Sequence, residues 1–230
     1  MTLDRNLTVA AVVLEHSECA NVFQAHKIDF CCHGGVSVGD ACAARGLDTA
    51  AVYADLERAI GARAGDCDDD DPRALSTPTL VAHIVTRHHE YLRKALPFIS
   101  QLTAKVARVH GDHNTKLPSL DEEYRRLRAM LEPHLEQEER VLFPALAGAA
   151  PDRALVSREL ASMHEDHLAV GASLGRLREL ADDYRAPDWA CGSYRAMLAE
   201  LRALESDVLR HVHVENHVLM PRFSDGTATA

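Results

Sequence analysis

The chain has 230 residues, of which 47% are hydrophobic and 5% aromatic, and 25 basic against 35 acidic residues give a net charge of −10. This apolar content supports a folded core and excludes a disordered chain, while the acidic balance argues against nucleic-acid binding, which depends on basic side chains that neutralise phosphates. We find no apolar run long enough for a signal peptide or a membrane span, so we expect a cytoplasmic protein without membrane contact.

The N-terminal part of the chain reads as short helices separated by turns. A helix is expected to start at Val9, with Thr8 as its N-cap, and two more are expected over 38–45 and 48–60. Between them, 29–35 combines two adjacent cysteines with two glycines and is expected to form a loop. These features predict a small helical domain.

An acidic segment then divides the chain. Residues 65–72 contain five aspartates, a glycine and a proline, a composition that suits a linker better than a core. It separates a predicted N-terminal domain, 1–64, from a larger domain, 73–224.

The larger domain is expected to be a four-helix bundle. Long helices are expected over 76–108, 120–147, 152–183 and 189–220, and each repeats apolar residues at steps of three and four. Four amphipathic helices with short to moderate connections predict an up-down-up-down bundle and an all-α fold.

The bundle contains an internal repeat. Residues 134–144 and 211–221 share the pattern His-x-x-x-Glu-x-x-Val-Leu-[Phe/Met]-Pro. The helix that precedes each copy carries one histidine at a matched position, His89 in the first and His167 in the third. The bundle therefore looks like two helix hairpins of one plan.

The repeat brings polar residues onto the apolar stripes. The six that are expected to face the bundle axis are His89, His134, Glu138, His167, His211 and Glu215. A buried carboxylate persists only when it is paired or bound to metal, and a histidine and a glutamate four residues apart share one helix face. Four imidazoles and two carboxylates suit two metal ions bridged by the carboxylates. Nitrogen and oxygen ligands favour iron or manganese over structural zinc.

Two alternatives bear on this ligand set. A single histidine on such a stripe is more often a hydrogen-bonded core residue than a ligand, but two copies in register argue against that interpretation. His88 lies on a neighbouring stripe and competes with His89, which the repeat alignment favours.

At this point the sequence resembles a known family. The paired signatures resemble those of hemerythrin-like di-iron proteins, and the whole chain is similar to the Repair of Iron Centres family, in which such a bundle follows a small domain with adjacent cysteines. The resemblance implies two non-haem iron ions, carboxylate-bridged by Glu138 and Glu215 and oxo-bridged, with the four histidines as the remaining ligands. Oxygen-carrying hemerythrins use five histidines, one glutamate and one aspartate, and this departure weakens an oxygen-storage function.

The resemblance also implies a function. The family restores iron-sulphur clusters after nitrosative or oxidative damage, by donating iron or removing nitric oxide, so the expected partners are damaged iron-sulphur proteins and nitric oxide or oxygen. The alternatives are a hemerythrin-like sensor or scavenger of oxygen or nitric oxide, and a di-iron nitric oxide reductase, so whether the protein is an enzyme stays open. The chain could act as a monomer or a homodimer.

Cys31 and Cys32 are the candidate catalytic thiols. Adjacent Cα atoms lie about 3.8 Å apart, closer than the roughly 4.4 Å of an unstrained disulfide, so a disulfide between them would be strained and easily reduced. We expect exposed thiols, with a pKa lowered by His26, Lys27 and His33. They could bind iron, pass it on, react with nitric oxide or exchange disulfides; the alternative is a pair of buried small side chains at a turn.

Overall fold

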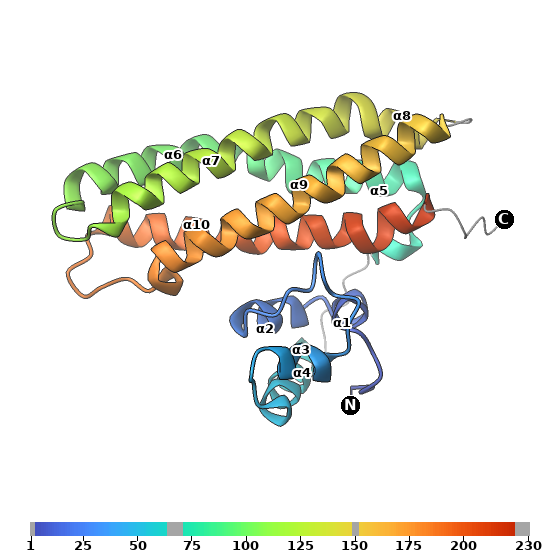
Figure 1. Ribbon diagram of the computed structural model, residues 1–230, viewed down its shortest axis with the longest axis horizontal. Helices are drawn as coiled ribbons and strands as arrows, with labels where there is room; N and C mark the ends of the chain where they lie inside the picture. Colours follow the sequence, from blue (N-terminus) through green and yellow to red (C-terminus); the bar gives the residue numbers. More distant parts are fainter. Residues whose placement is uncertain (1–2, 64–70, 149–151, 224–230) are drawn as a thin grey trace. The chain divides into compact units, whose positions relative to one another are not determined.

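The computed structural model describes residues 3–63, 71–148 and 152–223 (Figure 1). Over these ranges the regular elements are helices, and the only extended pairing is an isolated bridge between Thr8 and Ser37. The prediction of an all-α fold is confirmed. Most of the predicted linker, 65–72, lies outside the described residues. Within the described ranges, no helix has both the length and the apolar character that a membrane crossing requires.

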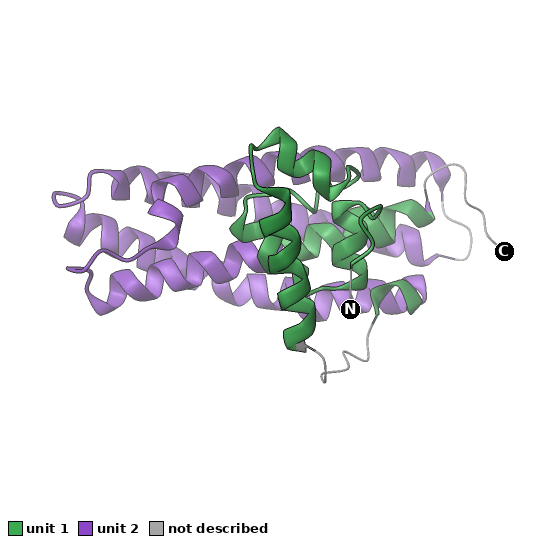
Figure 2. Ribbon diagram, turned by 90° about the horizontal axis from the view of Figure 1, so that it is seen from below, with its two compact units in different colours: residues 1–75, 209–222 green, residues 76–208, 223–230 purple. Residues whose placement is uncertain are grey.

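The chain divides into two compact units (Figure 2). The first comprises Met1–Leu75 and Leu209–Arg222, and the second comprises Ser76–Val208 and Phe223–Ala230. The domain boundaries that the sequence suggests, 1–64 and 73–224, remain a prediction.

Four helices build the N-terminal part of the first unit: α1 (Val9–Glu15), α2 (Cys19–Ala25), α3 (Val38–Ala44) and α4 (Thr49–Arg63). The N-cap expected at Thr8 is present, since its hydroxyl accepts the N–H of Ala11 at 3.2 Å. Helix α2 was not predicted. It has seven residues, and Glu18 before it makes no side-chain cap, so it carries neither of the usual signals of a helix start.

The expected loop at 29–35 is present and lies against the first turn of α1. Val9 donates its N–H to the carbonyl of Val36 at 2.9 Å, and Ala10 donates to that of Gly34 at 2.8 Å. A Cβ atom at Gly34 would lie 2.5 Å from the Phe30 oxygen and 2.8 Å from the Ala10 Cβ. Only glycine fits at this position without displacing the loop from the helix.

We therefore expect Gly34→Ala to lower the free energy of unfolding by about 1–3 kcal/mol, the usual range for overpacking. Gly35→Ala is the matched control, because a Cβ there meets nothing within 4 Å and should change stability by less than about 1 kcal/mol. Denaturant unfolding followed by circular dichroism measures both. Equal stability of the two variants would contradict the proposed fit.

The long helices of the bundle are mostly built from consecutive segments. The first long helix consists of α5 (Thr77–Ile84), a π-helical turn (Val85–His89) and α6 (Glu90–His110). The second consists of α7 (Lys116–Gln137), a π-helical turn (Glu138–Leu142) and α8 (Phe143–Ala147), and the third is α9 (Arg153–Leu180) alone. The fourth consists of α10 (Gly192–Val214), a π-helical turn (Glu215–Leu219) and a 3₁₀ turn (Met220–Arg222). Short 3₁₀ turns also occur at Pro72–Ala74 and Asp182–Tyr184. Helix α7 starts before the expected residue 120, because Pro118 in its first turn is tolerated there.

The long helices of the bundle lie alongside one another (Figure 1), and apolar side chains fill the space between them. Helix α6 packs on α7, and α7 on α9. Polar pairs add to this packing: Arg178 of α9 bonds Glu205 of α10 at 3.3 Å. The residues fully buried along the stripes include Leu92, Leu96, Ile99, Leu120, Leu127, Leu174, Leu177, Leu201 and Leu204. This core holds the helix faces that carry the predicted ligands.

The π-helical turns coincide with predicted ligands. His89 ends one turn, and Glu138 and Glu215 each begin one. In each turn a backbone N–H bonds the carbonyl five residues earlier, as from Phe143 to Glu138. Two of the turns are followed, at the second residue after their end, by a proline, Pro144 or Pro221, which supplies no N–H to the regular ladder. Such turns are rare and often lie at functional sites.

Candidate metal centre

Six buried side chains form two overlapping groups of candidate ligands. One group is His89, Glu138, His211 and Glu215, and the other is His134, Glu138, His167 and Glu215. Within each group the ligand atoms lie within 4.8 Å of one another. Both groups contain both glutamates, so each carboxylate is common to two sets of imidazoles. Together the two groups contain the six residues singled out from the repeat.

The surroundings of the Glu138 carboxylate show whether these residues suit a cation. Its side chain is 2% exposed, and neither carboxylate oxygen accepts a hydrogen bond. Instead, Oε2 lies 3.4 Å from Nε2 of His89, and Oε1 lies 3.3 Å from Nε2 of His134. A buried carboxylate without hydrogen bonds is strongly destabilising unless a positive charge compensates it. The donor set therefore fits metal ions.

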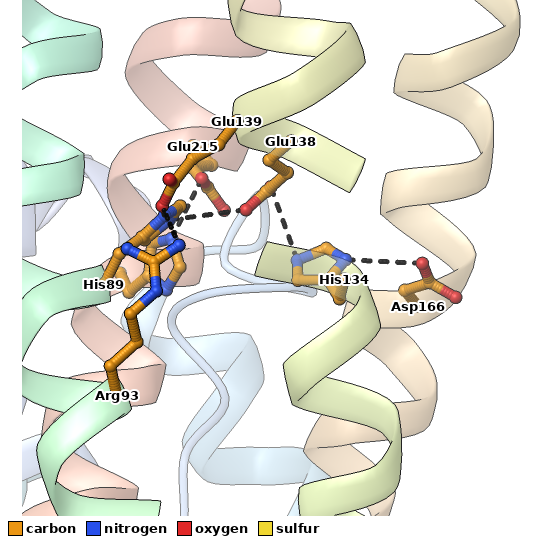
Figure 3. Close-up of polar contacts among 8 residues, drawn as sticks. His89, Arg93, His134, Glu138, Glu139, Asp166 and Glu215 are labelled. Carbon is orange, nitrogen blue, oxygen red and sulfur yellow. Dashed lines mark hydrogen bonds and ion pairs between the residues drawn. The ribbon is translucent and has the colours of Figure 1, made fainter. Parts of the chain in front are cut away.

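Outer carboxylates orient two of the imidazoles (Figure 3). Nδ1 of His89 lies 2.7 Å from Glu139, which also accepts a hydrogen bond from Arg93 at 2.7 Å. Nδ1 of His134 lies 3.3 Å from Asp166. An imidazole that donates from Nδ1 presents the lone pair of Nε2 to a metal. Burial alone would raise the pKa of Glu139, but the hydrogen bonds from His89 and Arg93 outweigh it and lower that pKa.

The orienting residues were only partly visible in the sequence. Glu139 stands next to Glu138 and could be noted as a neighbour, but Asp166 reaches His134 from another helix. His88, the alternative to His89, is buried and bonds Asp207 at 2.9 Å, and it belongs to neither ligand group. The position of His88 outside both ligand groups agrees with the alignment of the two repeats, which favours His89.

A pocket of about 470 Å³ opens beside Arg93 of α6 and Glu139 of the π-helical turn after α7. Arg93 and Glu139 line it, together with Glu132, Glu136 and Arg140. Since Glu139 also bonds His89, one carboxylate connects this pocket with a candidate ligand. Small polar solutes can therefore reach the residue that fixes the ring of His89.

The adjacent cysteines lie in a turn organised by Asp29. One oxygen of Asp29 accepts the backbone N–H groups of Cys31 at 3.0 Å and Cys32 at 2.9 Å, and the two sulphur atoms lie 3.5 Å apart. Burial would raise the pKa of Asp29, but the hydrogen bonds from Cys32, His33 and Cys31 lower it. Asp29 therefore holds the backbone of both cysteines and places a negative charge next to their thiols.

The expectation of exposed, activated thiols is wrong for Cys31. Its side chain is only 2% exposed. The hydrogen bond with Cys32, then burial, then the charge of Asp29 raise the pKa of Cys31 well above its ordinary value. Two of the histidines that were expected to lower the thiol pKa contact carboxylates instead. His33 lies 2.7 Å from Asp29, and His26 lies 2.9 Å from Asp55.

Two family models match this chain. The hemerythrin HHE cation binding domain matches residues 80–223, and the ScdA_N domain, a domain of unknown function, matches residues 5–60. The iron-sulfur cluster repair protein ScdA of Staphylococcus haemolyticus is 32% identical over 94% of this chain and 97% of its own length. The iron-sulfur cluster repair protein YtfE of Yersinia pseudotuberculosis is 30% identical over 95% of this chain and 96% of its own length.

The bundle and its buried His/Glu groups thus place the larger domain in the hemerythrin HHE cation-binding class. With the N-terminal domain and the relatives that span nearly the whole length, the chain belongs to the Repair of Iron Centres family of iron-sulfur cluster repair proteins.

We expect Glu139→Gln to weaken metal retention by roughly 10- to 100-fold, the usual effect of losing a carboxylate that orients a ligand histidine. Glu136→Gln is the matched control, because Glu136 lines the same pocket but pairs with Arg140. Competition with a chromogenic chelator measures retention. Equal retention by both variants would remove Glu139 from the site.

Proposed function

We propose that this protein holds two non-haem iron ions in its bundle and repairs iron-sulphur clusters damaged by nitrosative or oxidative stress. The observation that carries the proposal is that two buried groups of imidazoles share the same two carboxylates. This arrangement suits a pair of ions bridged by carboxylates better than a single ion. Imidazole and carboxylate donors suit iron, whereas structural zinc sites are typically rich in thiolates.

In this proposal the ligands divide between the two ions. His89 and His211 would hold one, His134 and His167 the other, and Glu138 and Glu215 would bridge them. Iron bound there would supply a metal ion for a damaged cluster or an electron source for nitric oxide. The chain's own residues exclude bulk water by burial and fix the imidazoles, as Glu139 does for His89 at 2.7 Å.

The relatives support the choice of client. ScdA and YtfE are named as iron-sulfur cluster repair proteins, and we extend that role to this chain, with damaged iron-sulphur proteins as its partners and the cytoplasm as its location. The domain at 1–64 with the thiol pair, the acidic linker at 65–72 and the bundle at 73–224 would act together.

Metal analysis with optical and Mössbauer spectra of the purified protein tests the bundle centre. We expect about two iron per chain, with a coupled pair that responds to nitric oxide. His167→Ala should lower the iron content, because it removes an imidazole from one ligand group. The control is His110→Ala, since His110 lies outside both groups and contacts Cys191. Protein without iron, or with zinc in its place, would refute the proposal.

We expect the thiol pair to be needed in cells. Cys31→Ser/Cys32→Ser should reduce recovery of a cluster enzyme after nitric-oxide exposure, whereas Cys191→Ser, at an exposed cysteine, should not. Recovery is read as enzyme activity in cell extracts over time. Full recovery with the double variant would show that the thiols are dispensable and would favour scavenging of the gas by the bundle alone.

A further inference from the structure

The loop with the adjacent cysteines forms a third group of candidate ligands, separate from the six bundle residues. Ligand atoms of Asp29, Cys31 and Cys32 lie within 4.8 Å of one another. The two sulphur atoms are 3.5 Å apart, and the sulphur of Cys31 lies 3.3 Å from Asp29. Two thiols and one carboxylate thus already converge.

The backbone of this loop is held on several sides. Asp29 binds the N–H groups of both cysteines. From the end of α10 and the turn after it, His213 donates from Nδ1 to the Phe30 carbonyl at 3.0 Å, and Asn216 donates to the Cys31 carbonyl at 2.9 Å. A site held in this way can present both thiols in one geometry without reordering the chain.

Two imidazoles contact the backbone of the loop and lie outside the group of three candidate ligands. His213 and His217 are four residues apart, which places them on one helix face, and their ring centroids lie 4.9 Å apart. The Nε2 atom of each ring is buried and has no hydrogen-bond partner. Because a carbonyl only accepts, Nδ1 of His213 carries the hydrogen that bonds Phe30, and its Nε2 is left with a lone pair.

The electrostatics favour a cation over thiol exchange. The raised pKa of Cys31 keeps its proton on the sulphur at neutral pH, and a protonated thiol is a poor nucleophile. A bound metal ion reverses this, because coordination deprotonates a thiol. The charged Asp29 next to the sulphur atoms also attracts a cation.

We propose that Cys31 and Cys32, with Asp29 beside them, form a second metal site for one thiophilic divalent ion such as ferrous iron or zinc. Each thiol releases its proton to solvent as its sulphur binds the ion, and no electron is transferred. The proposal goes beyond the bundle centre and does not require that centre to hold iron.

Cobalt(II) is the probe, because thiolate–cobalt bonds absorb in the near ultraviolet, whereas the bundle groups contain no sulphur. The test uses the full chain with its bundle metal retained and Cys191→Ser as background, under anaerobic conditions. We expect a thiolate–cobalt band that saturates at one equivalent. It should be lost in Cys31→Ser/Cys32→Ser while helical content and bundle metal stay unchanged. A missing band in the background protein, or an equal band in the double variant, would overturn the proposal.

A second measurement does not depend on a variant. Zinc or cadmium added before an alkylating reagent should protect Cys32, the partly exposed member of the thiol pair, read by mass spectrometry, and should leave Cys191 of the unmodified chain reactive. Equal alkylation of the thiol pair with and without metal would overturn the site. Loss of bundle iron would instead count against the proposed repair function, so the two failures are distinguishable.

Discussion

The constraint on which the bundle depends is the negative charge of Glu138, enclosed among apolar helices without a hydrogen bond to either oxygen. Such a charge opposes folding unless a cation compensates it. The surroundings make that compensation specific: Nε2 atoms of His89 and His134 face the two oxygens, and Glu139 and Asp166 fix the far sides of those rings. Binding of metal and stability of the bundle interior are therefore coupled.

Much of this centre could be predicted because it is encoded twice. The pattern at 134–144 recurs at 211–221, and the apolar stripe around each copy indicates which face is buried. Two matched copies select His89 over its neighbour His88 as the candidate ligand, which a single helix could not do. The long helices were predicted for the same reason, since their apolar period persists over many turns.

Other features depend on contacts that no local pattern records. The carboxylate of Asp166 meets His134 only after two helices pack. Helix α2 is too short to show a period and has no side-chain cap. Cys31 was expected to be exposed because glycines follow it in the sequence. In the structure the loop packs on α1, Asp29 binds the backbone of Cys31, and Asn216, far along the chain, binds its carbonyl. The direction of the Cys31 pKa shift could not be read from neighbouring residues in the sequence.

The π-helical turns have a consequence for how such a sequence can evolve. A π-helical turn holds one residue more than a regular helical turn, so Glu138 and Glu215 owe their direction to an inserted residue rather than to side-chain chemistry alone. Deleting one residue from Glu138–Leu142 would restore a regular helix and leave the two flanking helices in nearly the same relative orientation, but it would change the direction of the side chains within the turn. Substitutions near the centre can therefore be accepted more readily than insertions or deletions, because a change of length in a π-helical turn redirects the side chains of that turn.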